Sequence, residues 1–424
     1  MPQRLPVATA QSPLPVLALV MLLAALGTSI ANVGLPALAD AFGASFAEVR
    51  WVVIAYLVEV TALVVGAGAL GDRFGARRTL LGGLMLFSAG SALCALAPQL
   101  WLLVAARFVQ GAGAAVMMAT ALPLAAGLAP AGGAGRAMGL LGSASAIGTA
   151  AGPVAGGLLL AAFGWRALFL ATVPLGLLTL LLAARRLPRA PAGPVERNGG
   201  LPLHALLRDA PLRAALAASL LAMTVMMTTL VVGPFHLARS VGLDAAGVGL
   251  AMGAGPAAAA LAGVPAGRLV DRFGASAMVA AGLGGMSLGA VLLALFASAG
   301  VAGYVLPLVV LTAAFALFQA ANNSAAMAGA VPASRGAVSG LLQLSRNLGL
   351  IAGAFAMGGL FASASGGAAP ELVAHGTRVT FLVAALLLAA ALAVVKTSRP
   401  LAPARGRGQM DGPASPPSGT GVNQ

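Results

Sequence analysis

The chain alternates long apolar stretches with short polar ones. A helix needs about 20 mainly apolar residues to cross the hydrocarbon core of a bilayer, and twelve stretches approach or exceed that length. Their bounds are 14–36, 51–71, 79–97, 100–124, 137–162, 167–185, 213–235, 246–269, 277–299, 303–325, 336–362 and 378–395. Several contain glycine or proline, which membrane helices tolerate when neighbouring helices satisfy the freed backbone groups. The pattern predicts an all-α, polytopic membrane protein with twelve transmembrane helices.

Composition narrows the class of protein further. Of the 424 residues 60% are hydrophobic and 8% are charged, whereas soluble domains carry about 25% charged residues. One cysteine, Cys94, excludes a disulfide framework, and three histidines far apart in sequence (His204, His236 and His375) make a metal centre improbable. We therefore expect no metal and no cofactor.

Charge predicts how the helices are oriented. The net charge is +14, which in a soluble chain would suggest a nucleic-acid partner. Here the basic residues collect in alternate loops: with the N-terminus inside, the inside segments hold 18 of them and the outside loops hold 4. This bias predicts cytoplasmic termini and no nucleic-acid partner. The excess of arginine, alanine and glycine suggests a bacterial genome, so we expect the membrane to be a bacterial plasma (inner) membrane.

The polar segments divide the chain into two bundles. We expect a cytoplasmic N-terminus (1–13), a six-helix bundle (14–185), a basic cytoplasmic connector (186–212), a second six-helix bundle (213–396) and a disordered cytoplasmic tail (397–424) rich in proline, glycine and serine. The connector is too short and too charged to hold the two additional spans of a fourteen-helix exporter.

An internal repeat relates the two bundles. Residues 68–76 read GALGDRFGA and residues 267–275 read GRLVDRFGA, with seven of nine positions identical at an offset of 199 residues. Both copies follow the second span of their half. This predicts two pseudo-symmetric six-helix bundles in the same orientation, as in transporters whose site lies between the halves near the membrane centre.

Four stretches carry a family resemblance. The loop after the second span contains Gly68, Asp72, Arg73, Gly75, Arg77 and Arg78; the fourth span contains Arg107, Gln110, Gly111 and Gly113; the fifth contains Gly148, Gly152, Pro153, Gly156 and Gly157; and residues 339–349 read SGLLQLSRNLG. In these stretches the chain resembles the major facilitator superfamily, in particular its bacterial drug:proton antiporters.

The resemblance implies roles for two of these groups. The charged loop, with Asp271 and Arg272 as its weaker second copy, would hold a gate closed at the inner end; the alternative is a simple topology anchor. The glycines of the fifth span would let helix backbones approach closely and would seal the region between the halves; ordinary helix packing is the alternative.

Three charged residues fall well inside spans, namely Glu59, Arg107 and Arg346. A charge in mid-membrane costs at least about 2.5–3.5 kcal/mol, so each is a functional candidate. We expect Glu59 to carry the proton and to lie near one of the two arginines, with either one possible. The alternative is a static ion pair that holds helices together.

One position departs from the family pattern. Many related exporters carry an acidic residue in the first span, where this chain has Gly27. Either Glu59 replaces that carboxylate, or proton coupling is altered or lost.

Other side chains are candidates for a substrate cavity. The polar ones are Asn32, Gln110, Gln319, Asn322, Asn323 and Gln343, and the apolar ones are Met223 and Met227, with Met226 beside them. Methionines can form an adaptable apolar wall, although ordinary lipid-facing or core packing is the favoured interpretation. The polar ones can also bond to adjacent helices.

These features predict a monomeric secondary transporter. It would export small hydrophobic or cationic compounds in exchange for protons by alternating access. A nutrient or sugar carrier of the same fold is the alternative, followed by a membrane enzyme or a non-transporting sensor. An enzyme is disfavoured because the chain shows no nucleophile–base pair, metal-ligand spacing or phosphate-binding loop.

Overall fold

The protein is a bundle of long helices. The computed structural model describes residues 13–128, 134–188, 206–330 and 334–397, and within these ranges it contains helices and no strands. Eleven helices among the described residues are long and apolar enough to cross a membrane. The helix α4 (Trp51–Phe74) fills the remaining position among the twelve predicted spans. The all-α, membrane-spanning prediction is confirmed.

The N-terminal half holds the first six crossings. Its helices are α1 (Leu14–Val33), α2 (Leu35–Phe42), α3 (Phe46–Val49), α4, α5 (Ala76–Leu96), α6 (Leu100–Leu128), α7 (Ala134–Phe163), α8 (Arg166–Leu170) and α9 (Thr172–Arg186). Two crossings are interrupted: α1 gives way to α2 at Gly34, and α8 to α9 at Ala171. The first crossing therefore runs past its predicted end at residue 36.

The C-terminal half repeats this plan. It comprises α11 (Ala210–Phe235), η1 (His236–Ser240), α12 (Ala245–Phe273), α13 (Ala275–Leu295), α14 (Gly300–Ala328), α15 (Arg335–Ala352), η3 (Gly353–Met357), α16 (Gly358–Ser365) and α17 (Pro370–Thr397). Both η1 and η3 are short π-helices that continue a crossing. The helix α17 begins eight residues before the predicted span 378–395. Its first turns carry the polar residues Glu371 and His375, so the hydropathy pattern did not include them.

The two repeat sequences adopt the same local structure. Gly75 ends the second crossing with φ 86° and ψ 128°, and Gly274 ends the eighth with φ 83° and ψ 148°. Positive φ is accessible to glycine at little cost, which explains why this residue occupies both turns. In each copy the arginine two residues earlier lies over the ring of the intervening phenylalanine, at 5.5 Å and 5.1 Å. The pseudo-symmetry inferred from sequence thus extends to side chains.

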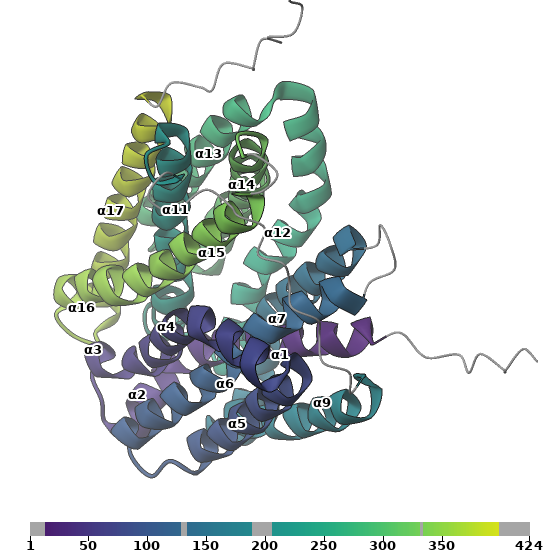
Figure 1. Cartoon of the computed structure of the whole chain (residues 1–424). Helices are drawn as coiled ribbons and strands as arrows, with labels where there is room; N and C mark the ends of the chain where they lie inside the picture. The colour runs from purple at the N-terminus through teal and green to yellow at the C-terminus, as the bar shows by residue number, and fades with distance from the viewer. Residues whose placement is uncertain (1–12, 129–133, 189–205, 331–333, 398–424) are drawn as a thin grey trace, which may run out of the picture.

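Within each half, glycines bring one pair of helices into close contact. A Cβ on Gly148 of α7 would lie 2.3 Å from the Leu22 carbonyl oxygen of α1, and a Cβ on Gly349 of α15 would lie 2.3 Å from the Leu220 carbonyl oxygen of α11. The pairs α1–α7 and α11–α15 are therefore equivalent in the two halves. Figure 1 shows α1 to α9 gathered in one half and α11 to α17 in the other, with α7 and α12 between them.

Candidate functional site

The two halves touch at one end of the bundle, opposite the end where α1 begins and α17 ends. There the backbones of α7 and α12 are in contact. A Cβ on Gly157 would lie 2.7 Å from the Gly249 Cα, and a Cβ on Gly249 would lie 2.6 Å from the Pro153 carbonyl oxygen. Gly148, Gly152 and Gly156 face α1 instead. The glycine-rich stretch of α7 thus serves two contacts, one inside its half and one between the halves.

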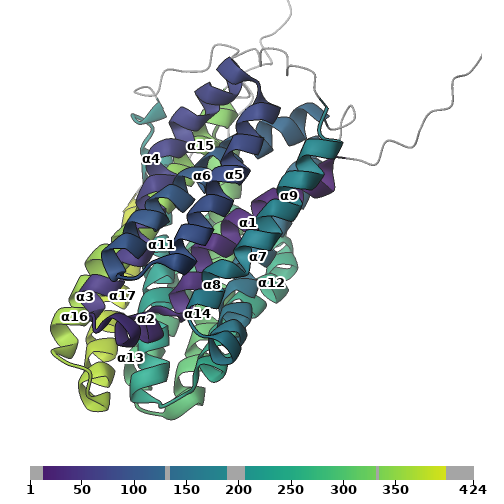
Figure 2. The same cartoon turned by 90° about the horizontal axis from the view of Figure 1, so that it is seen from below.

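The segment 40–51, which includes α3, adds side-chain contacts at the same end. The Phe46 ring packs edge-on against Phe235 of α11 and Phe361 of α16, with centroids 4.6 Å and 4.7 Å apart. The Arg50 guanidinium donates a hydrogen bond of 2.6 Å to the Phe355 carbonyl oxygen and lies over the ring of the same residue. Figure 2 shows α2, α3 and α16 together at this end. We call it the closed end.

An ion pair also spans the halves there. Arg239 of η1 pairs with Asp40 of α2, and it is the only ion pair among the described residues. The two side chains are 33% and 63% exposed, so the pair contributes about 0.2–1 kcal/mol. On the same segment, hydrogen bonds from the Ser45 hydroxyl and main-chain N–H lower the pKa of the exposed Glu48 carboxyl and order the start of α3.

Both π-helices lie at the closed end. Arg239 belongs to η1, and Phe355 belongs to η3. π-Helical turns are rare and concentrate at functional sites. The helix η1 supplies Arg239, which pairs with Asp40, and η3 supplies the main-chain oxygen of Phe355, which accepts from Arg50.

Removing the Phe46 ring should open the closed end more than removing the ion pair does. Phe46→Ala deletes two aromatic contacts worth about 0.5–1.5 kcal/mol each, which shifts a two-state equilibrium by roughly 5–150-fold. Asp40→Asn should shift it only a few-fold. Distances between spin labels at Ala41 and Ala368, both exposed at this end, measure the opening. Equal effects of the two variants would contradict this ranking.

A buried arginine lies inside the N-terminal half. Arg107 of α6 is fully buried; its Nε donates to the Val52 carbonyl oxygen at 2.9 Å and its Nη1 to the Gly27 carbonyl oxygen at 3.0 Å. Nη1 also donates to Gln110 Oε1 at 2.6 Å, and the guanidinium lies 4.3 Å from the Tyr56 ring centroid. Nη2 has no partner. Arg107 therefore ties α6 to α1 and α4 through main-chain oxygens.

The position of Gly27 has no room for a side chain. A Cβ there would lie 3.0 Å from the Phe87 ring and 3.1 Å from the Tyr56 hydroxyl oxygen. The Phe87 ring and the Tyr56 hydroxyl therefore border position 27 closely, and Arg107 bonds to the main-chain oxygen of Gly27.

Introducing the carboxylate should consequently destabilise the protein. Gly27→Asp overpacks this site, at a cost of about 1–3 kcal/mol, so the midpoint of thermal unfolding should fall. Phe87→Ala in the same chain makes room, and the double variant should lose less stability than the sum of the single ones. A purely additive double variant would show that Phe87 is not the obstacle.

Glu59 is half-buried on α4. Its Cβ lies 3.1 Å from the place that a Cβ on Gly111 of α6 would take. Among the described residues its carboxylate forms no ion pair with Arg107 or Arg346 and accepts no hydrogen bond. The sequence left open which arginine it approaches; in this conformation it is within 4 Å of neither.

Arg346 of the C-terminal half bonds to one of the predicted cavity residues. This arginine of α15 is half-buried, and its Nη2 donates a hydrogen bond to Asn323 Oδ1 of α14. Gln319 lies one turn before Asn323 and is also half-buried, and Gln343 is exposed one turn before Asn347, to which it donates at 3.0 Å. The fold thus pairs Arg346 with Asn323, which the sequence could not predict.

The other cavity candidates are mostly enclosed by protein. Asn322 donates to the Ala215 carbonyl oxygen and to Ser219 Oγ, both at 3.2 Å. Gln110 bonds to Arg107 and to Ser91. Asn32 is buried, and its Oδ1 accepts no hydrogen bond within the described part of the chain.

The methionines lie at a helix contact. A Cβ on Gly349 would lie 2.8 Å from the Met223 Cβ, and a Cβ on Gly353 would lie 2.6 Å from the Met227 Cβ. Met226 is half-buried beside them. Met223 and Met227 therefore belong to the contact of α11 with α15 and η3.

The charged turn after α4 bonds within its own half. Arg77 Nη2 donates to the Ala184 carbonyl oxygen at 2.6 Å, near the C-terminus of α9, where the helix dipole favours a cation. Arg73 and Arg78 are exposed, and so are Asp271 and Arg272 in the second copy. The side chain of Asp72 lies outside the described residues.

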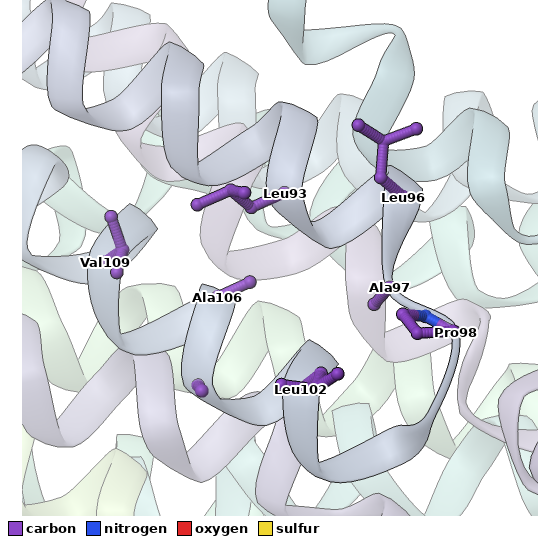
Figure 3. A pocket seen from close by; sticks show the side chains of 8 residues that line it. Leu93, Leu96, Ala97, Pro98, Leu102, Ala106 and Val109 are labelled. Carbon is purple, nitrogen blue, oxygen red and sulfur yellow. The ribbon is translucent and has the colours of Figure 1, made fainter.

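A groove of about 300 Å³ lies on the outer surface of the N-terminal half, between α5 and α6 (Figure 3). Its lining is almost wholly apolar and includes Leu93, Leu96 and Leu102. Leu96 is 76% exposed, as expected for a side chain that faces lipid. The groove is therefore separate from the contact between the halves.

Comparison with known proteins decides the family. The family model described as Major Facilitator Superfamily matches residues 17–235 and again residues 214–419. The chain belongs to this superfamily. The two successive matches agree with the duplication seen in sequence and structure. As a member of this superfamily, the protein is a multi-pass membrane transporter of small molecules.

Relatives of this superfamily member include transporters of different kinds. It is 30% identical to the uncharacterized transporter YebQ of Escherichia coli (strain K12), over 89% of this chain and 93% of that one. It is 37% identical to the riboflavin transporter RibZ of Clostridioides difficile (strain 630) over 38% of this chain and 35% of RibZ. It is 38% identical to the multidrug resistance protein B homolog of Mycobacterium tuberculosis (strain ATCC 25618 / H37Rv) over 35% of this chain and 27% of that protein. The last two alignments thus span about a third of those relatives.

A solved structure shares the fold. A bacterial homologue of the human lysosomal transporter Spinster, in an inward-facing and occupied conformation, matches with a TM-score of 0.78 at 16% identity, over 91% of this chain and 96% of that one.

Sequence reasoning missed the side-chain contacts of the closed end. Phe46, Phe235 and Phe361 are far apart along the chain and belong to no recognised motif. The one available signal was Arg50, which is among the few basic residues in the loops assigned to the outside.

Proposed function

We propose that this superfamily member exports small, largely apolar compounds in exchange for protons by alternating access. It would act as a monomer in the plasma membrane of a bacterium, with both termini in the cytoplasm and with no catalytic activity. The observation that carries the proposal is Glu59, the only carboxylate that the sequence places well inside a span, half-buried and unpaired among the described residues. The multidrug resistance protein among the relatives supports export.

The positive-inside bias gives the conformation a direction. If the termini lie in the cytoplasm, the closed end would face outward, and the structure would correspond to an inward-facing state. Alternating access would then require the contacts of Phe46, Arg50 and Gly157 to separate. The opposite end of the bundle, where α1 begins and α17 ends and which we call the termini end, would close at the same time.

Glu59 can couple this motion to a proton. When the termini end closes, water leaves the surroundings of the carboxylate, and an ionised acid in a dry, apolar site is costly. The carboxylate would therefore take up a proton in one state and release it in the other, which is the differential affinity that coupling requires. Substrate and proton would bind in alternation.

Arg107 has a different role in this scheme. All three of its hydrogen bonds go to groups of its own half, two of them to main-chain oxygens. We assign it to holding α1, α4 and α6 in register. Glu59 would then act without a second carboxylate on α1, where this chain has Gly27.

A vitamin or other nutrient carrier is the second candidate. The riboflavin transporter among the relatives favours it. The few polar side chains along the spans disfavour a strongly hydrated cargo such as a sugar.

Reconstitution in proteoliposomes tests the proposal. A pH gradient is imposed, and dyes, antibiotics, riboflavin and sugars are screened for movement against the proton flux. We expect accumulation of apolar aromatic compounds that collapses when a protonophore dissipates the gradient. Gradient-independent uptake, or transport confined to sugars, would refute proton-coupled export.

A further inference from the structure

The intramembrane charges of this chain do not balance. Two arginines and one glutamate lie well inside the spans, and none of them forms an ion pair among the described residues. The one ion pair of the described structure, Arg239–Asp40, is at the closed end. The spans therefore hold one more positive than negative charge, and among the described residues no carboxylate pairs with either arginine.

The two arginines differ in accessibility. Arg107 is fully buried, and the α1, α4 and α6 groups around it leave no surface for a ligand. Arg346 is half-buried. An arginine at mid-membrane that is not enclosed by protein faces the bundle interior or a water-filled cavity, because exposure to lipid would be very costly.

Arg346 lies near mid-membrane on a helix that also contacts the other half. It is 11 residues into a crossing that starts at Arg335, which is about 16 Å at 1.5 Å per residue. The helix α15 that carries it also contacts α4, the helix of Glu59 in the other half.

The neighbours of Arg346 are amides. Asn323 of α14 accepts one of its N–H groups and fixes the guanidinium. Gln319 lies one turn before Asn323 on α14, and Gln343 lies one turn before Arg346 on α15. A guanidinium presents five N–H donors in a planar fork, and Asn323 accepts from only one of its nitrogens. Among the described residues no other hydrogen bond from the Arg346 guanidinium is recorded and no acid pairs with it. A cation positioned in this way by an amide fits a carboxylate or another planar oxyanion.

We propose that Arg346, held by Asn323, binds an acidic group on the transported compound. The cargo is thus an apolar molecule with one carboxylate or similar anion. This inference rests on the proposed transport function and narrows its substrate class from hydrophobic or cationic compounds to hydrophobic acids.

Two dyes on one framework test the proposal. Fluorescein and rhodamine 123 share the same ring system, but fluorescein carries a free carboxylate at pH 8, whereas rhodamine 123 carries a methyl ester and a positive charge. Their affinities are measured by fluorescence polarisation on the full-length protein in nanodiscs, without any gradient. We expect fluorescein to bind more tightly, and Arg346→Gln to weaken fluorescein by about tenfold or more while rhodamine 123 changes less than twofold.

Matched variants control for charge and folding. Arg136→Gln removes an exposed arginine of α7 and should leave both dyes unchanged. Arg346→Lys keeps the charge without the fork and should weaken fluorescein by an intermediate factor. If Arg346→Gln does not fold, Arg346→Lys and Asn323→Ala decide, since each should weaken fluorescein several-fold and spare rhodamine 123.

Several results would overturn the assignment. These are the absence of fluorescein binding to the unaltered protein, equal affinity in the Arg346 variants, or equal loss of both dyes. Because binding is measured without a gradient, the readout is independent of proton coupling. Proton-driven export of rhodamine 123 with no effect of Arg346 would leave the proposed function standing and refute this inference alone.

Discussion

Proteoliposomes that contain the Glu59→Gln variant should lose gradient-driven transport and retain the fold. Glutamine is close to glutamate in size and can hydrogen-bond, but it cannot release a proton, so the half-buried site beside Gly111 stays filled while its charge no longer changes. We expect dye accumulation under a pH gradient to fall to the level of protein-free liposomes. Counterflow without a gradient should persist, because it needs only alternation of the two halves.

Glu371→Gln is the matched control for this experiment. Glu371 is exposed in the first turn of α17, so its loss should change neither transport nor thermal stability. Gradient-driven accumulation at the unaltered rate in the Glu59→Gln protein would show that the proton is carried elsewhere.

Gly157→Ala should disrupt the contact between the halves. The added Cβ would lie 2.7 Å from the Gly249 Cα, whereas carbon atoms pack at about 3.5–4.0 Å, so α7 and α12 must separate by about 1 Å. Overpacking of this kind costs about 1–3 kcal/mol. We expect slower transport and longer distances between spin labels at Ala41 and Ala368 across the closed end.

The same helix provides a control. A Cβ on Gly142 of α7 would meet nothing within 4 Å, so Gly142→Ala should leave transport and label distances unchanged and should slightly favour the helix. If both variants behave alike, helix propensity rather than the contact with α12 explains the effect.

The fold was predictable because a bilayer imposes length and hydropathy on every crossing. The repeat around Asp72 and Asp271 was enough to infer two related halves, and Gly75 and Gly274 take nearly the same backbone angles. The end of α2 and the start of α17 were not predictable. Where a helix extends beyond the hydrocarbon core its residues can be polar although its backbone hydrogen bonds continue, so hydropathy does not mark where it ends.

The candidate site was only partly predictable. Sequence picked out Glu59, Arg107 and Arg346 because charge in a span is rare, but it could not tell that Arg107 bonds to main-chain oxygens or that Arg346 meets Asn323. Those partners depend on how helices rotate about their axes and how closely they approach. A main-chain acceptor leaves no trace in the residue types, and for the same reason the contacts of Arg50 escaped detection.

The hydrogen bond from Arg50 to a main-chain oxygen also affects which amino-acid substitutions the closed end can tolerate during evolution. Arg50 donates to the main-chain oxygen of residue 355, which every amino acid possesses. Replacement of Phe355 would remove a ring but keep the acceptor, whereas replacement of Arg50 would remove the bond altogether. Position 355 should therefore tolerate substitution better than position 50, whereas the ring contacts of Phe46 with Phe235 and Phe361 constrain side chains of both halves.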